Sequence, residues 1–212
     1  MKKNKRINIK ETIKEHILNN SKEYIIVLLM FVIGVFVGVL FINNMNSEQN
    51  VEVSTYLTSF IDKFKNTENI NNVEILRTSV LQNFILACIL WFFGTTVIGL
   101  PVVFGIVLYR GFCLGYTVSA SIMVLGLSKG IPFILIALLL QNIIFIPSII
   151  AIAVSGFKLY KSIVKDRRKE NIKLEILRHT IFSLVMLGFL VISSMIEVFI
   201  STNLLKIIIK YF

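Results

Sequence analysis

Long apolar runs, separated by short polar segments, dominate the pattern of this chain. Residues 24–42 form an uncharged run of nineteen residues, which at about 1.5 Å per residue matches a bilayer hydrocarbon thickness of roughly 30 Å. Residues 80–157 form a second run, in which Arg110 and Lys129 are the only charged residues. A third run covers 180–200. Runs of this length and composition predict membrane-spanning helices.

The second run is too long for one helix and has to be divided by turns. Gly99 and Pro101 predict the first division, because proline disfavours helical geometry in the residue before it. The segment from Gly126 to Pro132 predicts the second division, and Pro147 is a further expected helix break. The expected spans are 24–42, 80–98, 101–125, 132–155 and 180–200.

The distribution of charge predicts how these spans are oriented. The net charge is +10; basic residues gather in 1–23 and 156–179, whereas 43–79 is mildly acidic. Basic segments beside membrane spans belong on the inner side. Five spans put both basic segments inside, and the acidic segment and the tail at 201–212 outside. The predicted fold class is therefore all-α: one polytopic integral membrane helix bundle of about five transmembrane helices, N-terminus inside and C-terminus outside.

Two polar segments have amphipathic patterns of their own. Residues 1–23 predict a basic amphipathic helix on the inner membrane surface, with a solvated arm as the alternative. Within the outer segment, 53–64 predicts a second amphipathic helix with an aromatic face. Its residues Tyr56, Phe60 and Phe64 are candidate partner contacts, because aromatic side chains dominate binding hot spots. The alternative is that this face lies on lipid headgroups.

Polar side chains inside the membrane are the other candidates for function. Arg110 falls near the middle of its span, as do Gln141 and Asn142, so we expect a structural polar layer in which the guanidinium faces the amide pair or backbone carbonyls. The alternative is that Arg110 reaches the inner headgroups. Lys129 and Glu197 share a depth near the outer side, which predicts a structural ion pair there, with a proton relay as the less favoured reading.

Composition and motifs argue against an enzyme. Hydrophobic residues make up 56% of the chain and charged residues 16%, and the length leaves no room for an additional catalytic domain. His16 and His179 are far apart in sequence, and Cys88 and Cys113 lie inside apolar runs. The sequence contains no HExxH or P-loop motif. We therefore expect no catalytic residues, no metal and no cofactor.

Four blocks within these spans carry a resemblance to a known family. They are WFFGTTVIGLP at 91–101, RGFCLGYTV at 110–118, QNIIFIP at 141–147 and ISSMIEVFIS at 192–201. In this order and at these spacings the chain resembles the stage II sporulation protein M family of endospore-forming bacteria. The resemblance covers nearly the whole chain.

The resemblance implies a non-enzymatic membrane anchor or assembly platform. Family members are mother-cell membrane proteins thought to hold two peptidoglycan-degrading partners, the stage II sporulation proteins D and P, during septal wall thinning and engulfment. The expected location is the septal and engulfing membrane, with anionic lipid headgroups but no nucleic acid as further partners. Small-residue faces such as Gly111 and Gly115 could meet the partners' own spans.

The alternative function is a small transporter or channel subunit with a polar site at mid-membrane. The layer at Arg110, Gln141 and Asn142 discriminates between the two functions. A water-filled cavity that reaches the layer favours the transporter, and a dry, closely packed layer favours the platform.

Overall fold

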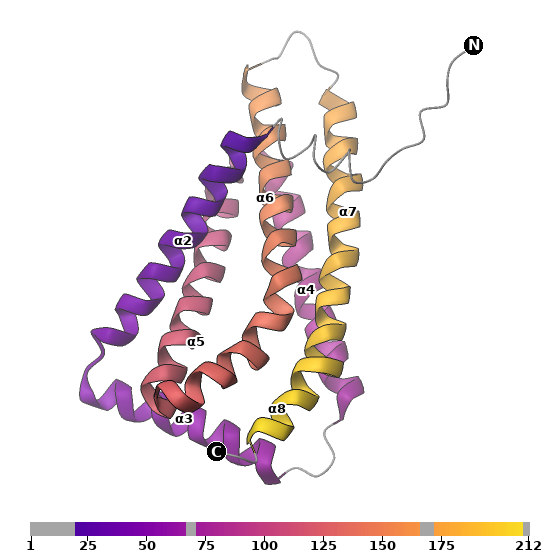
Figure 1. Cartoon of the computed structure of the whole chain (residues 1–212). Helices are drawn as coiled ribbons and strands as arrows, with labels where there is room; N and C mark the ends of the chain where they lie inside the picture. Colours follow the sequence, from indigo (N-terminus) through magenta and orange to yellow (C-terminus); the bar gives the residue numbers. More distant parts are fainter. Residues whose placement is uncertain (1–19, 67–70, 166–171, 210–212) are drawn as a thin grey trace.

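The computed structural model describes residues 20–66, 71–165 and 172–209, and its regular elements in these ranges are α-helices and two short π-helical segments (Figure 1). The predicted basic arm at 1–23 lies almost entirely outside the described residues. The elements are α2 (Ser21–Asn43), α3 (Ser47–Asn66), α4 (Asn72–Gly94), α5 (Leu100–Ile134), η1 (Leu135–Leu139), α6 (Leu140–Lys165), α7 (Ile172–Ile196), η2 (Glu197–Ser201) and α8 (Thr202–Ile209).

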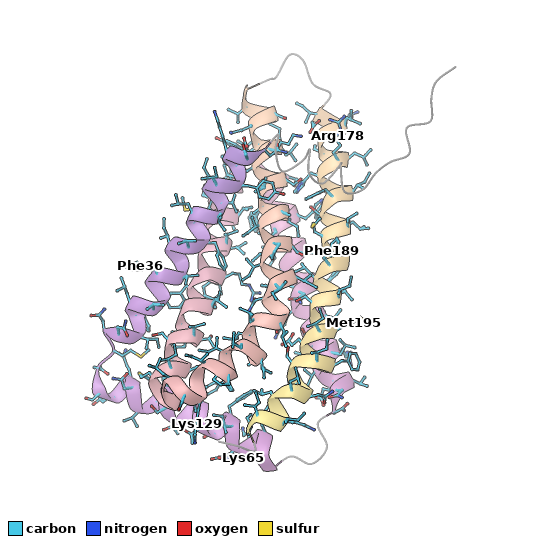
Figure 2. The ribbon with its side chains drawn as sticks, in the orientation of Figure 1. Phe36, Lys65, Lys129, Arg178, Phe189 and Met195 are labelled. Carbon is cyan, nitrogen blue, oxygen red and sulfur yellow. The ribbon has the colours of Figure 1, made fainter. Side chains whose placement is uncertain are left out.

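Four stretches of the described residues are long and apolar enough to cross a membrane. They are Ser21–Asn43, Asn72–Gly94, Leu100–Val164 and Ile172–Ile209. Many large outward-facing side chains of these helices are apolar, as Phe36 and Phe189 illustrate (Figure 2). Apolar side chains on the outside of a helical bundle are what a lipid environment requires, because lipid rather than water surrounds them.

The third stretch, of 65 residues, is interrupted by a reversal of the chain at Gly126. Gly126 has φ 73° and ψ 171°, a conformation open essentially to glycine alone. After it the chain doubles back, so that a Cβ on Gly130 would lie 3.1 Å from the carbonyl oxygen of Ser121 (Figure 1). The expected division is present, but it lies at Gly126, and Pro132 is inside the helical segment that follows.

The other two expected breaks have different outcomes. Between α4 and α5 the turn ends at Gly99, and Pro101 occupies the first turn of α5, where its missing N–H costs nothing. Pro147, in contrast, lies inside α6, which continues to Lys165. Proline is tolerated within membrane-spanning helices because neighbouring groups can satisfy the backbone carbonyl that it leaves without a donor. The expectation of a break at Pro147 was therefore wrong.

Glycines let α2 and α5 pack side by side with their backbones in contact. A Cβ on Gly34 or Gly38 of α2 would lie 2.0 or 2.3 Å from carbonyl oxygens of α5. Likewise, a Cβ on Gly111 or Gly115 of α5 would lie 2.2 or 2.1 Å from carbonyl oxygens of α2. Two small-xxx-small faces thus interlock, as is common between membrane helices. The expected role of Gly111 and Gly115 as a face for partner spans is corrected, because α2 already occupies it.

The helix α3 lies across one end of the bundle (Figure 1). It closes a small second core there, separate from the main core between the long helices, and contributes Ile61 to it with Phe60 and Phe64 packed against it. Phe133 from beyond the reversal and Leu205 and Ile209 from α8 complete this core. The predicted amphipathic segment at 53–64 is therefore the central part of α3, docked by its apolar face onto the protein.

Candidate functional site

A polar cavity of about 180 Å³ lies inside the bundle. On each of three helices the lining residues recur at spacings of three and four, so each helix presents one face to the cavity. Nine of its twelve lining residues are polar, charged or cysteine. The lining is Ser79, Gln82 and Asn83 of α4; Arg110, Cys113, Leu114 and Thr117 of α5; Leu138, Gln141, Asn142 and Phe145 of η1 and α6; and Glu197 of η2.

The structure brings Arg110, Gln141 and Asn142 together around this cavity. The guanidinium carbon of Arg110 lies 5.3 Å from the centre of the Phe145 ring, within range of a cation–π contact. The Asn142 amide donates to the Leu138 carbonyl at 2.8 Å, and no hydrogen bond between the guanidinium and either amide is present in the described residues. The arginine thus faces the cavity without a direct bond to the amides.

A ladder of hydroxyl and amide groups joins α4 to α7 beside the cavity. Asn83 donates to the Ser194 hydroxyl at 2.8 Å and to the Leu190 carbonyl at 3.3 Å. The Ser79 hydroxyl lies 3.0 Å from that of Ser194, and Ser193 donates to the Gln141 carbonyl at 3.0 Å. Sequence reasoning missed this ladder; the signal that could have revealed it is the pair of serines at 193–194 within an apolar span.

Glu197 has a different setting from the one expected. Its carboxylate accepts a hydrogen bond from Ser79 and lines the polar cavity with Arg110. Lys129 lies just beyond the reversal at Gly126, at the end of the bundle where Lys65 also lies (Figure 2). In the described part of the chain no ion pair joins Lys129 to Glu197, because Glu197 faces inward whereas Lys129 follows the turn at the bundle end.

A second polar cavity, of about 440 Å³, continues the first along α4. It is lined by Asn71, Glu74, Ile75 and Thr78, and it shares Ser79, Gln82 and Glu197 with the first cavity. Polar surface therefore extends from the start of α4, at the α3 end of the bundle, to Arg110. The layer predicted from the sequence therefore borders an open polar space and is not closely packed.

A family model described as stage II sporulation protein M matches residues 27–202. The chain belongs to this family. It is accordingly a sporulation membrane protein, and the resemblance carried by the four sequence blocks is confirmed. Comparison with curated proteins and with solved structures gave no match.

The match places the polar cavity inside the family's shared region. Residues 27–202, which the family model matches, include most of α2 and all of α3 to η2. The two π-helical segments both contribute to the cavity, Leu138 from η1 and Glu197 from η2. Such segments occur often at functional sites, since the extra residue in the turn reorients a side chain.

A buried histidine connects three helices at the opposite end of this family member. His179 of α7 is 2% exposed; its Nδ1 lies 2.9 Å from the Ser155 hydroxyl of α6. Its Nε2 lies 3.4 Å from the Trp91 carbonyl of α4. Because a carbonyl can only accept, the geometry assigns the ring proton to Nε2 and leaves Nδ1 to accept from Ser155. No neighbour of His179 could be predicted from the sequence, and the fold supplies two.

A five-residue motif at the reversal also needs its structural context. Residues 126–130 read GLSKG, which fits the GxSxG pattern of a nucleophile elbow. That motif requires a turn from a strand to a helix, whereas here it lies between two helical segments. Figure 2 places Lys129, next to Ser128, and Arg178, next to His179, at opposite ends of the bundle. A pair between Ser128 and His179 is therefore ruled out by position.

The aromatic residues of α3 divide into two groups. Phe60 and Phe64 stack with ring centres 4.8 Å apart and pack against the second core. Tyr56, in contrast, is 76% exposed. Of the three candidate partner contacts, Tyr56 is the one whose ring lies free on the surface of α3.

Proposed function

We propose that this protein is a non-enzymatic membrane platform that holds a peptidoglycan-degrading complex during septal thinning and engulfment. The partners are the stage II sporulation proteins D and P. The protein is a multi-pass protein of the septal and engulfing membrane, as the family resemblance implies. Membership of the stage II sporulation protein M family supports the setting. The arrangement of the helices supports the platform, in two steps.

The first step is the orientation of the bundle. We infer five crossings, made by α2, α4, α5 as far as Gly126, the chain from there to the end of α6, and α7. At one end the Lys161 ammonium pairs with Glu23, so the end of α6 lies beside the start of α2. Lys158 and Arg178 share that basic end, whereas α3 lies at the other. The positive-inside rule then puts α3 outside, facing the cell wall.

The second step is the surface that α3 presents, and this observation carries the proposal. The inner face of α3 packs through Ile61 against the second core, which holds the helix in place across the outer end of the bundle. Tyr56 projects from the outer face of α3 and is 76% exposed. A rigid exposed aromatic ring suits a binding hot spot, because it buries a large area with little loss of side-chain freedom.

Membrane co-purification with single substitutions on α3 tests the platform. Tyr56→Ser should lower recovery of the D and P proteins, since losing a hot-spot aromatic costs about 2 kcal/mol or more, roughly thirtyfold in affinity. Val51→Ser is the matched control, because Val51 is 65% exposed on the same helix but lies on another face. Phe60 and Phe64 are unsuitable for this purpose, since they hold α3 in place. Equal recovery with both variants, at equal protein levels, would refute the assignment.

A transporter or channel subunit is the second candidate, and the continuous polar space from Glu74 to Arg110 favours it. Cys113 lines that space and serves as a native reporter. In right-side-out vesicles a membrane-impermeant thiol reagent should label Cys113 in a Cys88→Ser background if water fills the route, with Cys113→Ser as the blank. Absence of labelling would remove this candidate and leave the platform as the function.

A further inference from the structure

The polar cavity at Arg110 adjoins an apolar groove of about 350 Å³. The two share Leu114, Leu138 and Asn142. Apart from Asn142, the groove is lined by apolar side chains of α5, η1 and α6, and it ends at Pro147. A polar chamber that adjoins an apolar groove has the form of a site for an amphiphile.

The groove also opens on the outer surface of the bundle. Ile143 is 60% exposed and Leu139 is 49% exposed, although both line the groove. These residues belong to the apolar surface that faces lipid. An acyl chain can therefore enter laterally from the bilayer, without crossing the polar ends of the protein.

The charges in the polar chamber specify the head of the amphiphile. Arg110 and Glu197 are its two charged lining residues, and no ion pair joins them in residues 20–66, 71–165 and 172–209. The Arg110 guanidinium lies over the Phe145 ring, and the Glu197 carboxylate accepts a hydrogen bond from the Ser79 hydroxyl. A charge at membrane depth costs at least roughly 2.5–3.5 kcal/mol without a counter-charge, so a ligand that brings both counter-charges is favoured.

We propose that the two adjoining cavities together bind a zwitterionic phospholipid with a phosphate and a primary ammonium in its head. The phosphate lies at the Arg110 guanidinium, which suits phosphate geometrically. The ammonium donates to the Glu197 carboxylate, and the amides of Gln82, Gln141 and Asn142 bind the remaining head oxygens. One acyl chain lies in the groove beside Leu138 and Ile143. The site does not depend on the platform function and would serve equally in a transport route.

Lipid retention measured by native mass spectrometry tests this site. The full-length protein is purified from vesicles containing equal amounts of phosphatidylethanolamine and phosphatidylglycerol. We expect the unaltered protein to retain phosphatidylethanolamine in preference, and Arg110→Gln to reduce retention of both lipids at least tenfold. Arg110→Lys, which keeps the positive charge but not the guanidinium geometry, should retain more lipid than Arg110→Gln. Arg77→Gln is the matched control, because Arg77 is an exposed arginine of α4 outside these cavities.

Substitution of the Glu197 carboxylate should change which lipid the protein prefers, and misfolding cannot produce such a change. Glu197→Gln should invert the preference toward phosphatidylglycerol, whose head carries no ammonium, whereas Glu48→Gln on the exposed face of α3 should leave it unchanged. Ile143→Trp should close the groove and lower retention of both lipids. Equal retention of both lipids by the unaltered protein would indicate surface lipid only and overturn the proposal. Binding of free phosphoethanolamine as tight as that of the lipid would overturn the role of the groove.

Discussion

The closest packing in the bundle, between α2 and α5, gives the sharpest prediction. Gly111 of α5 faces the backbone of α2, where an added Cβ would lie 2.2 Å from the carbonyl oxygen of Phe31. Gly111→Ala is the smallest change that introduces this atom. Gly105→Ala is its matched control, because Gly105 is on the same helix and a Cβ there would meet nothing within 4 Å.

The size of the effect follows from the geometry. Real Cβ atoms essentially never lie within 3.0 Å of another heavy atom, so α2 has to move away by about 0.8 Å. Overpacking of this kind costs about 1–3 kcal/mol, and the higher helix propensity of alanine offsets up to about 1 kcal/mol of it. A net loss of up to about 2 kcal/mol is expected for Gly111→Ala. Gly105→Ala should be neutral or slightly stabilising.

A second glycine of the same face makes the prediction more specific. A Cβ on Gly115 would lie 2.1 Å from the carbonyl oxygen of Val35. Because one outward movement of α2 relieves both contacts, the double variant Gly111→Ala/Gly115→Ala should lose less stability than the two single losses together. Such non-additivity is expected for neighbouring residues that share one backbone shift.

Thermal unfolding in detergent measures these differences. The fluorescence of Trp91, the single tryptophan, follows the transition, and size-exclusion chromatography records the monomer that remains after heating. One kcal/mol corresponds to about 2–4 °C for a domain of this length. Equal midpoints for Gly111→Ala and Gly105→Ala would refute the contact between α2 and α5, and with it the conclusion that partner spans are excluded from that face.

Three further predictions concern the reversal, the histidine and the ladder. Gly126→Ala should destabilise the protein by about 1–3 kcal/mol, because Gly126 has φ 73° and ψ 171°; Gly188→Ala, in open space, is the control in the same melting assay. His179→Phe should cost about 1–3 kcal/mol by leaving Ser155 and the Trp91 carbonyl without a partner, and a midpoint unchanged from the parent would contradict the link between helices. Asn83→Leu should lose about 0.6–1.7 kcal/mol of interhelical hydrogen bonding. The loss should appear as a lower midpoint, which Leu81→Ala on the exposed face of α4 does not reproduce.

The sequence was sufficient for the helical class and for the turn between α4 and α5. Apolar runs and the Gly99–Pro101 turn are local features, so their consequences could be derived from neighbouring residues alone. The prediction near Gly126 was correct as a division of the long run, although Pro132 and Pro147 proved to lie inside helices. A proline's effect depends on what packs around its freed carbonyl, and the sequence does not show that.

The candidate site depended on contacts between distant segments. Arg110 could be identified as costly from its depth alone, and so could the amides at 141–142. The cavity around them forms where faces of α4, α6 and η2 meet. Glu197 lines this cavity and does not form the expected ion pair with Lys129. The rotation of each helix about its axis, which periodicity in a uniformly apolar span cannot give, determines such contacts.

Hydrophobic pattern and charge, then, determined by themselves that this is a helical membrane protein and which of its ends carries the basic residues. They act one segment at a time, through transfer of each span into lipid. Only the tertiary structure decided that Gly111 faces α2, that Tyr56 alone of the α3 aromatic residues remains largely exposed, and that Arg110 borders an open polar space. Those features depend on packing between segments. Lipid solvates any apolar face of a helix equally, so close packing between helices determines which faces meet.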